Sequence, residues 1–422
     1  MTRRLLGTVL LLAVPLTTLA RDLPDEVRVR LLEEATPQAL VVSADAGLQF
    51  FAGEGPANVL AELAPSETAT IRIRGEDVYV EMSEMAFFAL SLRIIPLDGS
   101  LLSVEVTEGT QPPQPRRYPG HLRLDVDPSG PLKLVNHVAL DDYVACVVAR
   151  EYGFDDLEGA KVMAVLARTY VLRNVGKFGD DYDLVDHRLA QQYDGADHLT
   201  DTATEATRQT QGEVLMYQGE LVEAVYFSSS GGHTADNDAV WQGKPVPYLR
   251  GVADPYDAAS PHAQWSTTVP RDRLLRALSR RYDFEVEGFY LGDRSRDGRV
   301  QSIELLHDER TARVIPSNEF RLLVNQHFGK SGLKSTLFDV RRQGNHYLFA
   351  GRGFGHGVGL SQYGALEMSR RGTSYRDILT FYFTGVELQP MDGALSRPFV
   401  TEAPASNTAK PKPKKTSRRR GW

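Results

Sequence analysis

The stretch that decides the fold is LKLVNHVALDDYVACVVAREYG, residues 132–153, in which a strand pattern passes directly into a helix pattern. Its first part alternates apolar and polar residues, and its second part repeats apolar residues at helical spacing. Counted at about 100° per residue, Glu151 lies within about 60° of Val144, on the apolar face of this helix. A carboxylate on a buried face is costly unless it is paired, lies where the buried zone ends, or stays protonated. The helix therefore carries one acidic side chain that needs an explanation.

Two helices are expected in this part of the chain. The first follows Leu140, with Asp141 as N-cap, and ends at Gly153, a residue type that suits the left-handed position after a helix. The second covers residues 157–174, which are apolar nearly all round. Such a pattern predicts a buried central helix.

The residues before this stretch read as strands. Runs such as ALVVSA, TATIRIRG and LLSVEVTEG alternate in polarity, so residues 21–115 are expected to form a β-rich N-terminal region. The proline-rich segment at residues 111–120 suggests a boundary. In residues 116–395, strands and helices are interleaved without a regular βαβ rhythm. The predicted fold class is therefore α+β rather than a doubly wound parallel sheet.

The N-terminal twenty residues have the pattern of a secretory signal peptide. Two arginines precede an apolar run at residues 5–16, and small residues precede Arg21. The apolar run is short for an ordinary membrane span, so cleavage after Ala20 and export to the periplasm, envelope or medium are expected. An uncleaved N-terminal anchor is the alternative. Cys146 is the only cysteine of the chain, so no internal disulfide can form.

The C-terminal segment, residues 396–422, is basic. Seven lysines and arginines lie between Lys410 and Arg420 without an acidic residue, a composition typical of a disordered tail. Such a tail could make peripheral contact with an anionic envelope surface, or it could simply be solvated. The whole chain carries a net charge of −7, which argues against nucleic acid as a partner.

Glu151 is the candidate general acid. It lies near the end of its helix, where the negative pole of the helix dipole disfavours ionisation, and on the apolar face, where desolvation does the same. Both effects raise the pKa of a carboxyl group, and an acid still protonated near neutral pH can protonate a leaving oxygen. The alternative is that the helix leaves the core here and that Glu151 is solvated or paired with Arg150 or Arg168.

Three long motifs follow one another along the chain. The opening stretch continues into GAKVMAVLARTYVL (residues 159–172), followed by YFSSSGGHTADNDAVW (226–241) and GRGFGHGVGLSQYGALEMSRRG (351–372). Together they resemble the signature of the stage II sporulation protein D (SpoIID/LytB) family over roughly residues 120–388. Departures include Asp141 in place of a glutamate and Cys146 in place of a glycine, but Glu151 is retained.

The resemblance implies lytic transglycosylase chemistry on peptidoglycan. Such an enzyme cleaves glycan strands between N-acetylmuramic acid and N-acetylglucosamine, with peptide-free strands favoured, and leaves 1,6-anhydro ends. The muramic acid 6-hydroxyl is the nucleophile, so one glutamate, here Glu151, can suffice where ordinary glycosidases use two carboxylates. The alternative implied by other family members is a non-catalytic wall-binding modifier that stimulates a cell-wall amidase. A further alternative, that the N-terminal region is the working part and binds a protein partner, has no motif behind it.

Further residues of the motifs are candidate glycan contacts: Arg168, Tyr170, Ser229, Gly231, Gly232, His233, Trp241, Tyr248, His356, Gln362 and Tyr363. Arg168 is expected to pair with a carboxylate, Glu151 or Asp254, or to hold an acidic group of the glycan. Trp241 and Tyr248 offer flat faces to sugars, although either could belong to the core. His356 could contact sugar, orient Glu151, or be structural.

The glycines that alternate from residue 351 to residue 359 would let either a ligand or another backbone approach closely. Ser361 is expected to cap the next helix. A nucleophilic serine, Ser229 with His233, is the rival chemistry, but the surrounding sequence lacks a nucleophile elbow. Cys146 lies about 140° from Glu151 around the helix and has no cysteine or histidine near it in sequence. No metal and no cofactor are therefore expected.

Overall fold

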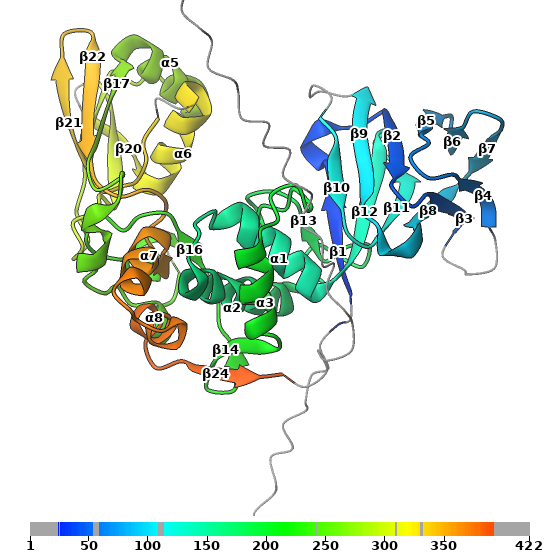
Figure 1. Ribbon diagram of the computed structural model, residues 1–422. Helices are drawn as coiled ribbons and strands as arrows, with labels where there is room; N and C mark the ends of the chain where they lie inside the picture. The colour runs from blue at the N-terminus through cyan, green and yellow to red at the C-terminus, as the bar shows by residue number, and fades with distance from the viewer. Residues whose placement is uncertain are drawn as a thin grey trace, which may run out of the picture.

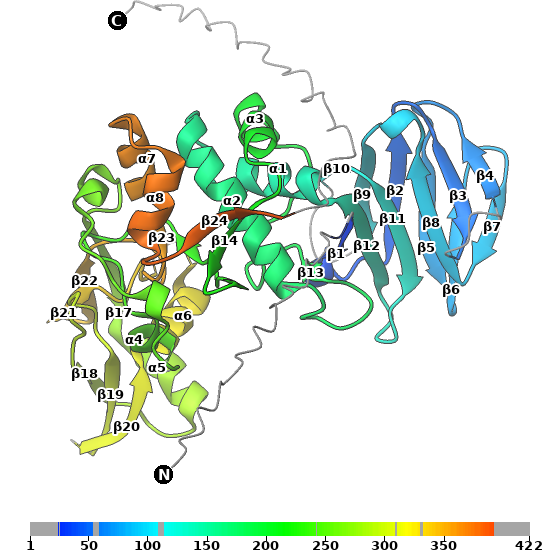
Figure 2. The same ribbon diagram turned by 90° about the horizontal axis from the view of Figure 1, so that it is seen from below.

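The computed structural model describes residue 24 and residues 26–53, 59–108, 114–241, 243–308, 310–329 and 332–391. The expected signal peptide (1–20) and basic tail (396–422) lie outside these residues. Strands and helices are mixed, which confirms the α+β class (Figures 1 and 2). Among the described residues, no helix has both the length and the apolar character needed to cross a membrane.

Two sheets make up the β-rich region, seen at the right of Figure 1. The first has the order β13 (Leu184–Val185), β1 (Glu26–Leu31), β12 (Leu132–Ala139), β11 (His121–Val126), β8 (Ser91–Pro96), β3 (Leu48–Ala52) and β4 (Val59–Leu63). The second has the order β10 (Arg116–Tyr118), β9 (Leu102–Glu108), β2 (Ala39–Ala44), β5 (Ala69–Arg74), β6 (Asp77–Glu81) and β7 (Ala86–Ala89). Buried and less buried residues alternate along these strands, as in β8 and β11, because one face of each sheet packs on the core.

The boundary expected near residue 115 does not separate two structural units. β10 pairs with β9, and β11 and β12 pair with β8 and β1, so residues 116–139 complete the N-terminal sheets. Pro112, Pro113 and Pro115 fall between β9 and β10, which are neighbouring strands of the second sheet, and so do not mark a boundary between two domains. The transition from the sheets to the helices comes instead at the end of β12.

The helical centre begins where β12 passes directly into α1 (Leu140–Glu151). Gly153 has a φ of 54°, the left-handed conformation expected after the helix. Asp141 is not the N-cap, since that position is Ala139 and has no side-chain cap; Asp141 binds Arg168 instead. α2 (Leu157–Asn174) is buried along most of its length, which confirms the central helix, and α3 (Asp201–Gln209) packs beside it. The apolar residues of the sheets and of α1 and α2 form one continuous core.

Residues 265–351 have a hydrophobic core of their own, seen at the left of Figure 1. This unit contains two sheets and two helices: β17 (Trp265–Pro270), β22 (His346–Gly351) and β21 (Phe338–Gln343) in the first sheet, β18 (Gly288–Leu291), β19 (Ser302–His307) and β20 (Arg310–Pro316) in the second, with α5 (Arg271–Tyr282) and α6 (Ser317–Phe328). Its first and last strands are neighbours, since Trp265 pairs with Gly351. The chain therefore enters and leaves the unit at one place.

The remaining elements join the helical centre to this unit. They are the sheet of β15 (Glu220–Leu221), β14 (Glu213–Tyr217) and β24 (Glu387–Pro390), the parallel pair β16 (Tyr226–Phe227) and β23 (Leu360–Ser361), and the helices α4 (Asn237–Trp241), α7 (Gln362–Arg370) and α8 (Tyr375–Tyr382). The Ser361 side chain accepts a hydrogen bond from the Gly364 N–H, which confirms it as the N-cap of α7. β16, β23 and the start of α7 lie against the end of α1, next to Glu151.

Candidate active site

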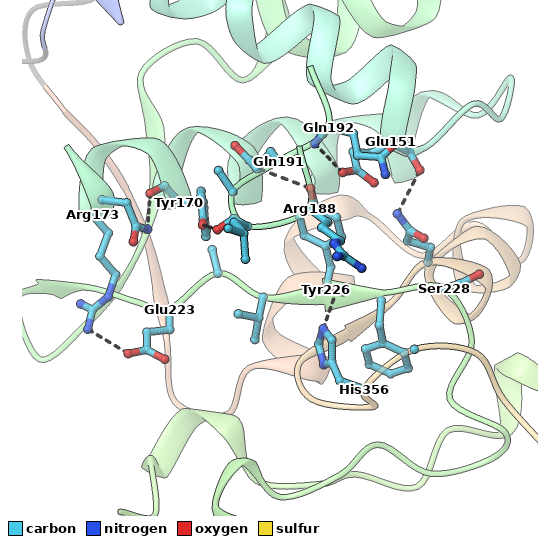
Figure 3. A pocket seen from close by; sticks show the side chains of 18 of the residues that line it. Glu151, Tyr170, Arg173, Arg188, Gln191, Gln192, Glu223, Tyr226, Ser228 and His356 are labelled. Atoms are coloured by element: carbon cyan, nitrogen blue, oxygen red, sulfur yellow. Dashed lines mark hydrogen bonds and ion pairs between the residues drawn. The ribbon is translucent and has the colours of Figure 1, made fainter. Parts of the chain in front are cut away.

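A groove with a volume of about 790 Å³ lies at the C-terminal ends of α1 and α2 (Figure 3). One wall consists of these helix ends and the loop that follows β13, and the other wall consists of β16 and the segment before β23. The lining residues are Glu151, Tyr170, Arg173, Asn174, Lys177, residues 188–192, residues 223–228, Trp241, residues 354–356 and Gln362. The groove is open to solvent rather than enclosed, as a site for part of a longer polymer must be.

Glu151 is the last residue of α1 and is half-buried at one end of the groove. Its Oε1 accepts a hydrogen bond of 2.9 Å from the backbone N–H of Gln192. Its own carbonyl accepts a hydrogen bond of 3.0 Å from Nε2 of Gln362, the first residue of α7. Both walls therefore hold this glutamate in place (Figure 3).

The pKa of Glu151 is raised above the ordinary glutamate value of 4.5, mainly because burial disfavours the carboxylate. The Gln192 N–H, the Arg150 charge and a side-chain hydrogen bond from Tyr226 act in the opposite direction, but they do not outweigh burial. Arg150 is itself bound to Asp194 at 2.5 Å. The carboxyl group therefore has the environment of a general acid.

A chain of hydrogen-bonded polar side chains leads to the Glu151 carboxyl group. Gln191 donates from Nε2 to the hydroxyl of Tyr226 at 3.4 Å, and Tyr143 donates its own hydroxyl to Gln191 at 3.5 Å. The Tyr226 hydroxyl in turn contacts the Glu151 carboxyl. Burial holds the pKa of Tyr226 well above its usual value, so it remains a neutral donor.

The rings of His356 and Trp241 pack against each other in the second wall of the groove. Their ring centroids are 5.2 Å apart, and Trp241 is 40% exposed. The His356 Nε2–H donates to the Tyr226 carbonyl at 3.0 Å, and its Nδ1 accepts from the Val358 N–H at 3.1 Å. Burial lowers the pKa of His356 to about 4, so it is neutral. Both ring nitrogens are used within the chain, so His356 does not orient Glu151, whereas the exposed indole is available to a ligand.

Three cationic side chains line the groove: Arg173, Lys177 and Arg188. Arg173 is bound to Glu223 at 3.4 Å, at the end of the groove away from Glu151, whereas Arg188 lies nearer to Tyr226 (Figure 3). Lys177 and Arg188 are exposed. Arg188 forms no ion pair with any described residue. The exposed cations of the groove can therefore receive an acidic group.

Five of the predicted site residues line the groove: Glu151, Tyr170, Trp241, His356 and Gln362. The others, Arg168, Ser229, Gly231, Gly232, His233, Tyr248 and Tyr363, do not line it. Tyr363 packs edge-on against Phe154 and His262. Tyr248 is only 8% exposed, and its hydroxyl accepts from the Glu223 N–H, so it belongs to the core.

The prediction that Arg168 contacts the glycan is wrong. Its side chain is 0% exposed and pairs at 2.9 Å with Asp141, not with Glu151 or Asp254. The same guanidinium donates to the carbonyls of Thr210 and Glu213. Arg168 thus ties α2 to α1 and to the strand after α3, because a buried guanidinium needs several acceptors.

Ser229 and Gly231 form hydrogen bonds within the protein and do not line the groove. Asp257 is buried and accepts from the Ser229 hydroxyl at 2.7 Å and from the Gly231 N–H at 2.8 Å. His233 donates from Nδ1 to a neighbouring carbonyl, and the exposed Gly232 donates its N–H to the Ser230 hydroxyl. Within the described chain, Ser229 and His233 therefore form no nucleophile–base pair.

Two of the alternating glycines, Gly353 and Gly359, admit a second backbone. Gly353 has a φ of 75°, and a Cβ there would lie 2.7 Å from the Ser229 carbonyl. Gly359 has a φ of 78°, and a Cβ there would lie 2.2 Å from the Val225 carbonyl. The segment before β23 and the strand that contains β16 can approach so closely only because these positions lack side chains.

Sequence reasoning missed three contributors to the groove. Gln192 and Arg188 lie in a loop without a recognisable motif, and they reach the groove only because β13 pairs with β1. Tyr226 begins the motif YFSSSGG, but the motif does not predict that the Tyr226 hydroxyl contacts the Glu151 carboxyl group. The described groups that could hold a metal ion include no groove residue.

Comparisons with known proteins identify relatives of the chain. The profile of the stage II sporulation protein family matches residues 129–217, and that of a domain of unknown function (DUF8618) matches residues 264–359. The chain is 30% identical over 281 residues to stage II sporulation protein D of Bacillus amyloliquefaciens, which is 62% of this chain and 78% of that protein. The protein of the same name from Bacillus subtilis matches to the same extent. The amidase enhancer of B. subtilis is 28% identical over 278 residues, 55% of this chain and 38% of that protein.

Proposed function

The chain belongs to the stage II sporulation protein D family, and from this premise we propose that it is an exported lytic transglycosylase that cleaves the glycan strands of peptidoglycan. Family membership and the similarity to an amidase enhancer fit a role at the cell wall. The observation that carries the finer proposal is Glu151, a half-buried carboxyl with a raised pKa that faces an open groove.

In the proposed reaction, protonated Glu151 donates its proton to the glycosidic oxygen as the bond from C1 of N-acetylmuramic acid breaks. The resulting carboxylate takes the proton of the 6-hydroxyl of the same sugar, and that oxygen bonds to C1. The products are a 1,6-anhydro end and a new free hydroxyl on N-acetylglucosamine. One carboxyl group serves both steps, and the Gln192 N–H and the Tyr226 hydroxyl stabilise its ionised form between them.

The proposed substrate is a strand without stem peptides. Each muramic acid residue of such a strand carries a free lactyl carboxylate. The exposed cations Arg188 and Lys177 are suitably charged to bind it. The exposed face of Trp241 suits stacking against a sugar ring.

Export remains part of the proposal and rests on residues 1–20. The basic tail is proposed to add loose attachment to an anionic envelope surface, an effect that salt would screen.

A second candidate function is favoured by the similarity to the amidase enhancer. In this case the groove binds the wall without cleaving it, and the bound protein stimulates a cell-wall amidase. Glu151 would then contribute to binding or to folding rather than to proton transfer.

The test is to incubate the purified protein with peptide-free glycan strands and to examine the products by mass spectrometry. Fragments with 1,6-anhydro ends are expected. Binding to the strands without any new anhydro ends, together with faster amidase digestion of intact walls, would instead support the second function.

A further inference from the structure

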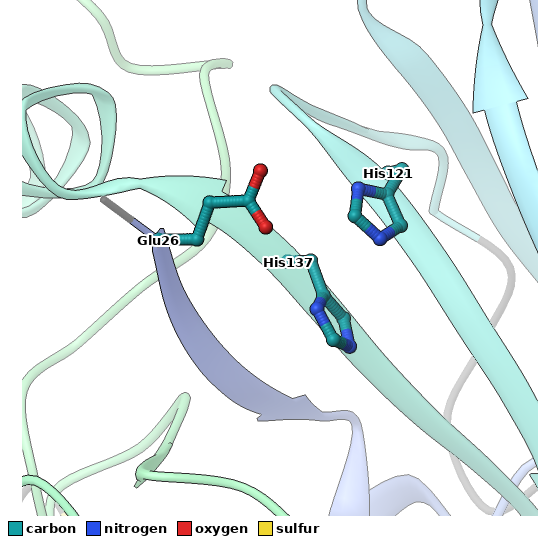
Figure 4. A group of neighbouring side chains, drawn as sticks. All are labelled: Glu26, His121 and His137. Carbon is teal, nitrogen blue, oxygen red and sulfur yellow. The ribbon is translucent and has the colours of Figure 1, made fainter. Parts of the chain in front are cut away.

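Three potential metal ligands lie on one face of the first sheet and do not line the groove. Glu26 is on β1, His137 on β12 and His121 on β11, which are neighbouring strands. His121 lies directly opposite His137, and Glu26 lies opposite Ala139, two residues further along the same face of β12. The ligand atoms of the three side chains all lie within 4.8 Å of one another (Figure 4).

The two imidazoles lie together, and one of them has a buried ring nitrogen without a partner among the described residues. Their rings stack with centroids 4.6 Å apart, and Nε2 of His137 is buried without a hydrogen-bond partner among the described residues. A buried polar atom with no partner is costly, and a metal ion bound at this nitrogen would satisfy it.

The neighbouring cations do not exclude a metal ion. Arg28 is bound to Asp183 at 2.9 Å, and Arg123 is bound to Asp125 at 3.2 Å. Arg93 lies over the ring of Phe51, 5.0 Å from its centroid. Carboxylates therefore offset the charges of Arg28 and Arg123, while Glu26 supplies a negative charge within the cluster itself.

We propose that Glu26, His121 and His137 bind one divalent transition-metal ion, with zinc the best fit, and that this ion clamps β1 to the middle of the sheet. Two imidazoles and one carboxylate are a common zinc ligand set, and water fills the fourth position. Tetrahedral zinc needs its ligand atoms about 3.3 Å apart, which side-chain rotations can achieve from the present separation. The ion would join β1, β12 and β11 in addition to their backbone hydrogen bonds.

This inference is independent of the proposed function. It departs from the expectation, based on the surroundings of Cys146, that the chain binds no metal. The three ligands are far apart in sequence and form no motif, so only the strand register brings them together.

The test uses full-length mature protein stripped of metal by a chelator that is then removed. Zinc is titrated against a chromophoric chelator, and cobalt(II) serves as a second probe because tetrahedral cobalt absorbs visible light. We expect one zinc per chain and a rise of several degrees in melting temperature at saturating zinc, because the ion binds only the folded state. His137→Ala should weaken zinc binding at least about 10-fold, and Glu26→Gln, a milder change, should also weaken it.

The matched control is His307→Ala. His307, Glu287 and Asp308 form the other such group in the described chain, but Glu287 and Asp308 are exposed. This variant should bind zinc like the wild type. The proposal is overturned if the wild type binds no zinc at micromolar concentrations, if His307→Ala abolishes binding, or if folded Glu26→Gln and His137→Ala proteins both bind as tightly as the wild type.

Discussion

Glu151→Gln is the substitution that most directly separates catalysis from binding. The amide keeps the size of the side chain, and its oxygen can still accept the 2.9 Å hydrogen bond from the Gln192 N–H. The hydrogen bond from Gln362 Nε2 is also retained, because it is made to the backbone carbonyl of residue 151. Only the transferable proton is lost. Glycan cleavage should therefore fall by about 10²–10⁴-fold, the range typical for removal of a general acid.

Stability should change little, and in a direction that depends on pH. Because burial raises the pKa of Glu151, the wild-type group contributes its full stability below the unfolded-state value of 4.5 and loses it as pH rises through the folded-state pKa. Glutamine does not titrate. The free energy of unfolding of the variant should therefore rise relative to wild type across this window and end at or slightly above the wild-type value near neutral pH. The retained hydrogen bond is worth only about 1 kcal/mol, so large changes are not expected.

The assay measures anhydro ends released from peptide-free strands, with strand binding measured in parallel by co-sedimentation. Glu220→Gln, the same change at an exposed residue outside the groove, is the matched control and should keep wild-type activity. A folded Glu151→Gln protein that cleaves at the wild-type rate would refute the role of this residue. An unfolded Glu151→Gln protein would show that Glu151 is structural. Glu151→Asp, which keeps the carboxyl group on a shorter side chain, would then test whether any activity remains.

Three further perturbations follow from the contacts. The activity of the wild type should decline on the alkaline side of its pH profile with an apparent pKa above 4.5. Tyr226→Phe should move this decline to higher pH, because the Tyr226 hydroxyl lowers the pKa of Glu151. A pH profile of kcat/KM that is unchanged in the variant would contradict this. Arg188→Ala should raise KM by about 2- to 5-fold at low salt with kcat unchanged, as expected for an exposed charge; an equal effect on carboxyl-reduced strands would show that no lactyl carboxylate is bound. Arg168→Met should lower the free energy of unfolding, measured in urea, by about 3–5 kcal/mol because it leaves Asp141 uncompensated; normal stability with weaker glycan binding would restore a substrate role for Arg168.

Much of the fold could be predicted because its signals are local. The α2 sequence is apolar all round, and Gly153 and Ser361 mark helix boundaries by their own backbone preferences. The predicted domain boundary near residue 115 was wrong because a domain boundary depends on contacts that are not local. Prolines in a surface connection look the same whether they join two domains or two strands, and only the pairing of β10 with β9 distinguishes the two cases.

The catalytic candidate could be found from helical periodicity, but its surroundings could not. Glu151 stands out because a carboxylate on an apolar stripe is unusual, whereas Gln192 acts through its backbone N–H, which any residue could supply. Arg168 was misplaced because the motif gives its identity but not its partner. Asp141, on the first turn of α1, was read as a cap and is in fact that partner.

The parallel pairing of β16 with β23 determines when the groove can form during synthesis. Ser228 and Ser361, which lie at this pairing, are separated by 133 residues, and the separately cored unit of residues 265–351 is threaded between them. A chain that emerges from its N-terminus can complete the sheets, α1 and α2 while the second wall is still missing. Gln362 reaches the carbonyl of Glu151 only after that whole unit has emerged. Nascent or truncated chains should therefore carry Glu151 on an open surface, and the site matures at the end of chain synthesis rather than with the helix that bears it.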